Sequence, residues 1–227
     1  MKEDKSSSRR RFLTNAAIGA VGIAGASHLL SSCSGENESK ELDLPTLLDE
    51  APDGEPLKAG VIGCGGRGTG AGLNFINAGP NLQIVALADV FQDRIDACRQ
   101  RLKEQAGIEI SDEKCFLGFE AFQKVMEQDI DVIILATPPY FRPEHFKASV
   151  DANKHVFMEK PVAVDPVGIR SVIASARRAE NLGLTVVTGT QRRHSRDYVA
   201  TYQKIAGENA IGKIVAANAY WNQANLW

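Results

Sequence analysis

A glycine-rich turn directly after a short apolar run constrains the fold of this chain more than any other feature. Residues 58–62 are mostly apolar, and Gly63-Cys-Gly-Gly-Arg-Gly68 separates them from residues 69–78, which can form a helix. A strand, a G-x-G-x-x-G turn and a helix in this order are typical of dinucleotide-binding domains. In a chain with 20 glycines, an ordinary loop is the alternative explanation.

The glycines of this pattern have separate mechanical tasks. Gly63 permits the tight turn, Gly65 lets the backbone approach a pyrophosphate, and Gly68 allows the helix to pack closely on the strand. The pyrophosphate is expected at the N-terminus of the following helix. We therefore predict that the whole turn binds the cofactor, through Gly63, Cys64, Gly65, Gly66, Arg67 and Gly68.

An acidic residue stands where the fingerprint expects one. Residues 82–88 predict a second buried strand, which ends in Asp89, roughly twenty residues beyond the last glycine. Asp89 is expected to hold the adenosine ribose hydroxyls and to repel a 2′-phosphate, which favours NAD, while Arg67 and Arg94 nearby keep NADP possible. The local alternative is that Asp89 caps a helix over residues 92–103.

Strand-like and helix-like segments continue to alternate along the chain. The apolar runs predict further strands at 115–117, 131–136, 154–158 and 184–188, with helices at 119–128, 143–153 and 167–181. Six strands separated by helices favour a doubly wound parallel α/β sheet, here a Rossmann domain over residues 57–193. Thr137-Pro-Pro139 follows a strand and places a loop at the carboxyl edge, where such sheets bind ligands.

Composition favours small-molecule chemistry. The 26 basic and 28 acidic residues nearly cancel, so the charge footprint of a dedicated nucleic-acid binder is missing. The four cysteines, at positions 33, 64, 98 and 115, have neither zinc-site spacing nor the density of a disulfide scaffold. We expect no metal site and no nucleic-acid partner.

The first 56 residues are predicted to direct and tether the protein. Consecutive arginines before Phe12 and an apolar run over 16–30 are typical of a twin-arginine signal in residues 1–33, which implies the twin-arginine export machinery as a partner. Cys33 closes a lipoprotein-like box, which predicts lipidation and a periplasmic or cell-surface, membrane-anchored protein. Residues 34–56 form a polar linker. The alternatives are a basic helix start and a chance cysteine.

From about residue 57 onward the chain resembles the Gfo/Idh/MocA oxidoreductase family. The resemblance rests on ordered motifs: Gly63-Cys-Gly-Gly-Arg-Gly68, Ala88-Asp89, Ala136-Thr-Pro-Pro139, Lys154-His155-Val156 with Glu159-Lys160-Pro161, and Gly189-Thr-Gln-Arg-Arg193. It implies an NAD(P)-dependent oxidoreductase that transfers hydride from a hydroxyl of a sugar, glycoside or cyclitol, and a full-length protein that forms homo-oligomers.

The resemblance also implies roles for individual residues. Lys160 is carried over as the catalytic residue, since an ammonium group stabilises a developing alkoxide and relays its proton. Glu159 is expected to tune Lys160, and a cis peptide bond is expected before Pro161. The cofactor channel is expected to include Thr137, Pro138, Pro139, Glu159 and Lys160. Gln191, Arg192 and Arg193 are expected to approach the nicotinamide or substrate, with a solvated basic turn as the alternative.

Three departures from the family pattern limit these expectations. Arg142 stands where many relatives have histidine, and His145, one helical turn later, is expected on the helix surface rather than in that histidine's role. Asn153 replaces a usual glycine, a mild change because asparagine tolerates left-handed backbone. Residues 194–227 are expected to begin a truncated α/β substrate domain, with its first strand at Ile211–Tyr220. Such a chain would bind cofactor but turn over poorly.

Two other functions remain open. Related proteins cleave glycosides by transient oxidation with NAD, and sequence alone does not separate that chemistry from net oxidoreduction. The remaining alternative is a non-catalytic surface lipoprotein that binds a sugar or nucleotide, against which the retained Lys160 argues.

Overall fold

The computed structural model describes residues 42, 44 and 54–222. The signal predicted at 1–33, the lipidation site Cys33 and nearly all of the predicted linker lie outside the described residues. The chain divides into two compact units, of which Leu44–Ala200 holds the sheet, and the described residues from Thr201 onward belong to the other.

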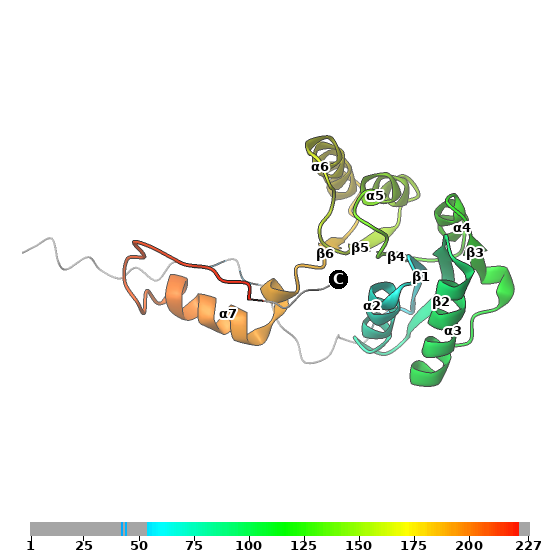
Figure 1. Ribbon diagram of the computed structural model, residues 1–227, viewed down its shortest axis with the longest axis horizontal. Helices are drawn as coiled ribbons and strands as arrows, with labels where there is room; N and C mark the ends of the chain where they lie inside the picture. Colours follow the sequence, from blue (N-terminus) through cyan, green and yellow to red (C-terminus); the bar gives the residue numbers. More distant parts are fainter. Residues whose placement is uncertain (1–41, 43, 45–53, 223–227) are drawn as a thin grey trace, which may run out of the picture. The chain divides into compact units, whose positions relative to one another are not determined.

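Six parallel strands form one sheet in the order β3-β2-β1-β4-β5-β6 (Figure 1). The strands are β1 (Leu57–Ile62), β2 (Leu82–Asp89), β3 (Cys115–Leu117), β4 (Val132–Leu135), β5 (His155–Met158) and β6 (Val186–Thr188). The strand order reverses between β1 and β4, where a doubly wound sheet opens a crevice at its carboxyl edge. The predicted fold class is confirmed.

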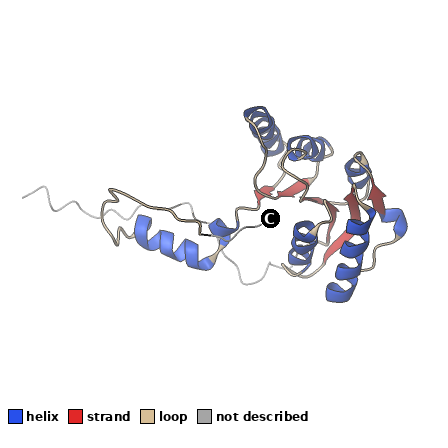
Figure 2. Cartoon of the chain, in the orientation of Figure 1, coloured by secondary structure: helices blue, strands red, loops and turns tan. Residues whose placement is uncertain are grey.

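Helices cover both faces of this sheet (Figure 2). On one face, α2 (Gly66–Ile76) and α3 (Gln92–Ala106) pack on an apolar cluster that includes Val61 and Ile134. On the other face lie α4 (Ala121–Met126), α5 (Arg142–Asp151) and α6 (Pro166–Asn181), around a cluster that includes Ile133 and Phe146. Because the central strands are covered on both sides, they read in the sequence as continuous apolar runs.

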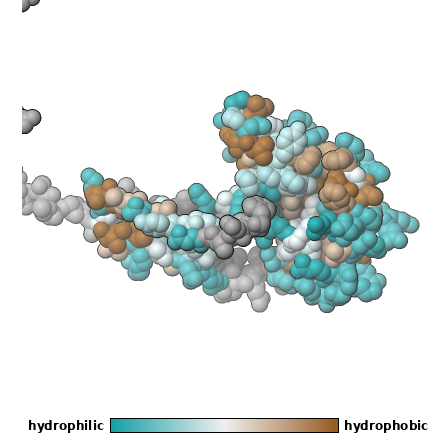
Figure 3. All heavy atoms as spheres, in the orientation of Figure 1, coloured by the Kyte–Doolittle hydropathy of each residue, from teal (hydrophilic) through white to brown (hydrophobic). Residues whose placement is uncertain are grey.

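Helix α6 exposes several apolar side chains within its own unit. Val167, Ile169 and Ile173 are exposed there, and Figure 3 shows hydrophobic side chains gathered over this helix. The same helix buries Ser175 and Ala179, and Ala179 belongs to the apolar cluster on this face of the sheet.

The segment after the sheet differs from the sequence prediction. A short 3-10 turn η3 (Gln191–His194), helix α7 (Arg196–Tyr202) and a π-helical turn η4 (Gln203–Gly207) follow β6. The strand predicted at Ile211–Tyr220 is wrong: these residues form a turn and irregular, exposed chain. An apolar β-branched run forms a strand only when a neighbouring strand satisfies its backbone groups, and the described residues offer none here.

Among the helices that the structure describes, none has the length and apolar character needed to cross a lipid bilayer.

Candidate functional site

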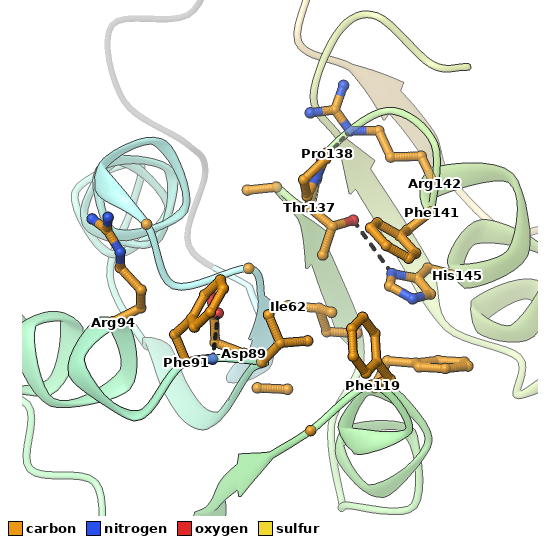
Figure 4. A pocket seen from close by; sticks show the side chains of 17 residues that line it. Ile62, Asp89, Phe91, Arg94, Phe119, Thr137, Pro138, Phe141, Arg142 and His145 are labelled. Carbon is orange, nitrogen blue, oxygen red and sulfur yellow. Dashed lines mark hydrogen bonds between the residues drawn. The ribbon is translucent and has the colours of Figure 1, made fainter. Parts of the chain in front are cut away.

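A cavity of about 570 Å³ opens at the carboxyl edge of the sheet, beside the ends of β1, β2 and β4 (Figure 4). Backbone of the glycine turn, the carboxylate of Asp89, and a largely aromatic wall enclose it. The lining residues are Ile62, Gly63, Gly65, Ala88, Asp89, Val90, Phe91, Arg94, Gly118, Phe119, Phe122, Ala136, Thr137, Pro138, Phe141, Arg142 and His145. The cavity lies at the carboxyl edge of the sheet, where the sequence predicts a ligand site.

The glycine turn has the close contacts that its pattern predicts. Gly63 has φ +95°, and a Cβ there would lie 2.7 Å from the carbonyl carbon of Ala136. A Cβ on Gly68 would lie 1.8 Å from the carbonyl oxygen of Gly63, so no larger residue fits at either position. A Cβ on Gly65 would meet no atom within 4 Å, which leaves open space against the backbone where a pyrophosphate is expected.

Helix α2 begins at this turn without a side-chain cap. Its N-cap is Gly65, and no side chain of the described residues caps it. The first amide groups of a helix have no partner within the helix and carry partial positive charge. The start of α2 is thus suited to an anion such as a pyrophosphate.

Asp89 is held by the two loops that flank it. Its Oδ2 accepts a hydrogen bond from the Cys64 amide at 2.6 Å, and its Oδ1 accepts from the Phe91 amide at 3.0 Å. The N-cap of α3 is Phe91, with no side-chain cap, so the alternative role of Asp89 as a helix cap is wrong. The carboxylate is instead fixed between the glycine turn and the cavity.

Cys64 contributes through its backbone while its thiol belongs to the core. The side chain is buried, and its Sγ donates to the carbonyl oxygen of Ala88 at 3.4 Å. A hydrogen bond with the Cys98 thiol, together with burial, raises the pKa of the Cys64 thiol. The neutral thiol packs beneath the turn, and the amide of Cys64 orients Asp89.

The loop after β4 forms the opposite wall. Of the three residues predicted to line a cofactor channel, Thr137 and Pro138 line this cavity, whereas Pro139 is half-buried and does not line it. The Thr137 hydroxyl lies 3.3 Å from Nδ1 of His145 (Figure 4).

His145 is a correction to the sequence analysis, which expected it on the helix surface. The residue is 6% exposed, stacks on Phe122 with ring centroids 4.3 Å apart, and lines the cavity. Burial lowers the pKa of His145 to about 4, so the ring is neutral at neutral pH. The residue points inward because α5 turns its Phe146 and Val150 side toward the sheet, and His145 lies beside that side.

Four aromatic residues of the cavity were missed by the sequence analysis: Phe91, Phe119, Phe122 and Phe141. Phe91 and Phe119 each follow closely on the end of a strand, β2 and β3, and this placement at the carboxyl edge was a usable signal. Phe122 and Phe141 depend on the packing of α4 and α5, which the local pattern does not specify.

The predicted catalytic segment lies after β5. Lys160 is exposed and the Lys160–Pro161 peptide bond is cis, which confirms that expectation. Glu159 is 3% exposed, and its Oε1 accepts from Nε of Arg67 at 2.6 Å. The carboxylate of Glu159 therefore binds the glycine turn rather than Lys160, and a Cβ on Gly189 would lie 2.7 Å from its Oε2.

The basic residues predicted around the site are divided. Arg94 lines the cavity, with its Nε 3.8 Å from Asp93. Gln191, Arg192 and Arg193 lie exposed in η3 and outside this cavity, and the guanidinium of Arg192 lies over the ring of Tyr198 at 5.4 Å. Their approach to nicotinamide or substrate stays a prediction.

Within residues 54–222 and the two earlier described positions, no group of three or more histidine, cysteine or carboxylate side chains is placed to hold a metal ion.

The arrangement agrees with the similarities of the chain to known proteins. Residues 57–188 match the Gfo/Idh/MocA oxidoreductase family, described as having an NAD-binding Rossmann fold. An inositol 2-dehydrogenase of Salmonella typhimurium is 27% identical over 143 residues, which are 63% of this chain and 39% of that protein. A glycosyl hydrolase family 109 protein of Bacteroides thetaiotaomicron is 34% identical over 115 residues, or 50% of this chain and 24% of that protein.

Solved structures show the same fold. A myo-inositol 2-dehydrogenase from Lactobacillus plantarum has a TM-score of 0.58 at 24% identity, covering 71% of this chain and 44% of that one. A mutant of a 3-ketoreductase from Actinomadura kijaniata, in complex with TDP-benzene and NADP, has a TM-score of 0.54 at 25% identity, covering 70% of this chain and 46% of that one. The chain spans about two fifths of the length of the inositol dehydrogenases it matches. With its glycine turn, its acidic residue after β2 and a family match over most of the sheet unit, the chain belongs to the Gfo/Idh/MocA oxidoreductase family.

Proposed function

We propose that this protein binds NAD, with NADP as the less favoured form, and transfers hydride from a hydroxyl of a cyclitol, sugar or glycoside. The observation that carries the proposal is the position of Asp89 at the end of β2, bonded to the Cys64 amide and lining the cavity. A carboxylate there accepts hydrogen bonds from ribose hydroxyls and repels a 2′-phosphate.

The residues present fit a dinucleotide. Gly65 leaves open space over the backbone, and the uncapped start of α2 offers amide groups to a pyrophosphate. The aromatic wall, with Phe91 and Phe119, offers apolar surface to an adenine ring. When bound, the nicotinamide supplies the hydride acceptor of the reaction.

Lys160 carries the proton chemistry in this proposal. Hydride leaves a carbinol carbon only as the hydroxyl loses its proton, so an ammonium group beside that oxygen stabilises the developing negative charge. Glu159, which pairs with Arg67, holds the glycine turn against the loop that carries Lys160.

Nucleotide binding is the first test. We expect nucleotide to be released from the purified protein on denaturation, and Asp89→Ala to weaken NAD binding by about tenfold or more, because ribose hydrogen bonds are lost. Asp112→Ala, which removes a surface ion pair with Arg99, is the matched control and keeps the affinity of the parent. Parent-like NAD affinity in Asp89→Ala would remove the assignment of the acid.

Lys160→Ala tests the catalytic role. In the full natural protein we expect kcat to fall by about 10²- to 10⁴-fold, the usual contribution of a general acid or base. Lys147→Ala removes a surface ion pair with Asp151 and is expected to leave kcat unchanged. Turnover unaffected by loss of Lys160 would instead favour a non-catalytic binding protein.

A second candidate is glycoside cleavage through transient oxidation. The 34% identity to a glycosyl hydrolase family 109 protein favours it. Release of free sugar from a glycoside without net formation of NADH would support this function. Reduction of a second carbonyl substrate would support net oxidoreduction.

We also propose that the protein is exported by the twin-arginine route and carries a lipid anchor at Cys33. Two further proposals are that residues 194–227 begin a substrate domain and that the full-length protein forms homo-oligomers. The arginine motif before Phe12 and the apolar run ending at Cys33 support export and anchoring. Palmitate labelling of the parent, lost in Cys33→Ser, tests the anchor. Labelling that persists in the variant would contradict it.

A further inference from the structure

Arg142 is a buried cation that has no role in the reaction proposed above. It is the first residue of α5, and it is only 6% exposed. In the sequence, Arg142 stands where many relatives have histidine. Its contacts, however, join the two loops that frame the proposed reaction site.

The guanidinium of Arg142 donates to three backbone carbonyl groups. Nε donates to the carbonyl oxygen of Thr137 at 2.7 Å, a bond drawn in Figure 4. Nη1 donates to the carbonyl oxygen of Glu159 at 2.8 Å and also to that of Pro161. The residues immediately before and after Lys160 are therefore held by one nitrogen atom.

This geometry links the cavity wall to the lysine backbone. Thr137 lines the cavity, while Glu159 and Pro161 bracket Lys160. A single planar group thus fixes the backbone of the lysine loop relative to the cofactor wall. Arginine suits this task because its donors form a rigid fork, whereas a lysine ammonium is a single point on a flexible stem.

Burial of this charge costs free energy, because the guanidinium is removed from water. Removal from water lowers the pKa of Arg142, and the negative charge of Glu159 opposes that effect. The partners named above are all carbonyl groups, which supply geometry without neutralising the cation.

We propose that Arg142 is a positioning residue for Lys160: by tying Thr137 to Glu159 and Pro161, it holds the lysine at the distance from the cofactor wall that proton transfer requires. The inference rests on the proposed hydride-transfer function for its catalytic consequence. The tie between the loops does not depend on that function, so the two are tested separately.

The first measurement is independent of activity. In Arg142→Lys we expect hydrogen exchange at the Glu159 amide, which donates to the carbonyl oxygen of Leu135, to become about tenfold faster or more as the loop loosens. Exchange in α3 stays as in the parent. Arg178→Lys, which alters a surface ion pair with Asp151, is the matched control and changes neither. If Arg142→Lys unfolds, the same measurement is made on Arg142→Met, which removes the buried charge.

The second measurement is a kinetic split in the full natural protein. We expect Arg142→Lys to lower kcat by roughly 10- to 100-fold through misplacement of Lys160, while the Kd for NADH stays within about threefold. A residue that only stabilises the fold would lower the unfolding midpoint and leave kcat of the folded enzyme unchanged.

The outcomes distinguish this inference from the proposed function. Faster exchange at Glu159 with a loss of kcat supports both. If exchange at Glu159 is faster in the Arg142 variant but the parent protein transfers no hydride, Arg142 still joins the two loops and the proposed function is rejected. Parent-like exchange at Glu159 in the folded variants overturns the positioning role, whatever the activity.

Discussion

At the scale of single residues, two glycines of the same helix have opposite environments. A Cβ on Gly68 would lie 1.8 Å from the carbonyl oxygen of Gly63, whereas one on Gly70 would meet no atom within 4 Å. Gly68→Ala should therefore lower the free energy of unfolding by about 1–3 kcal/mol or more through overpacking. Gly70→Ala, the matched control in α2, should raise it by about 0.5–1 kcal/mol, because alanine favours helix. Urea denaturation measures both, and equal effects would contradict the packing argument.

His145 links a single residue to the pH dependence of stability. Its pKa is lowered from 6.5 to about 4 by burial in the folded protein. Between these values the unfolded chain binds a proton that the folded chain does not, so stability falls as pH falls from 6.5 to 4. The total effect of His145 is about 3 kcal/mol.

Comparison of two variants isolates this effect. The parent should lose about 2–3 kcal/mol more stability than His145→Gln between pH 7 and pH 4.5. His194→Gln changes an exposed histidine in η3 and should behave as the parent. Denaturant titrations at the two pH values provide the measurement, and identical losses in parent and His145→Gln would show that the buried ring is not responsible.

At the scale of elements, the helices after β2 and β5 begin differently. Asp165 caps α6, accepting from the Gly168 amide at 2.6 Å, whereas the N-cap of α3 is Phe91 and Asp89 accepts from the Cys64 amide. Asp165→Ala should lower the free energy of unfolding by about 1 kcal/mol. Asp165→Ser should keep most of the stability that the cap contributes, because serine also caps helices. Thermal or urea unfolding of both variants provides the comparison. A serine variant as unstable as the alanine variant would argue against the cap.

The same pair of aspartates shows what the sequence could and could not predict about elements. Period and glycine spacing were enough to place six strands and their order of alternation, because the central strands are apolar along their whole length. Asp89 does not cap α3 because that helix begins after Phe91, and the bond of Asp89 to the Cys64 amide joins residues 25 positions apart. Local pattern carries no information on such contacts.

At the scale of the molecule, the part of the site that escaped the sequence depends on how whole layers pack. His145 was expected on the helix surface and Arg142 was noted only as a departure from the family pattern, yet both line the cavity because α5 packs on β4 and β5. The strand expected at Ile211–Tyr220 failed for the converse reason: its pattern is suitable, and no neighbouring strand among the described residues pairs with it. The sequence pattern identifies candidate strands and site residues, but whether they form depends on the elements that pack or pair with them.

The cavity should survive removal of everything after Ala200. All of its lining residues lie between Ile62 and His145, within the compact unit Leu44–Ala200. A chain that stops at Ala200 should keep the far-ultraviolet circular dichroism signal of the folded sheet unit. It should bind NAD within about threefold of the parent, because no residue that lines the cavity is removed. Calorimetric titration of the two chains measures this. A folded, shortened chain that no longer binds NAD would place part of the cofactor site after Ala200, and Asp89→Ala in both chains would show whether the ribose contact persists.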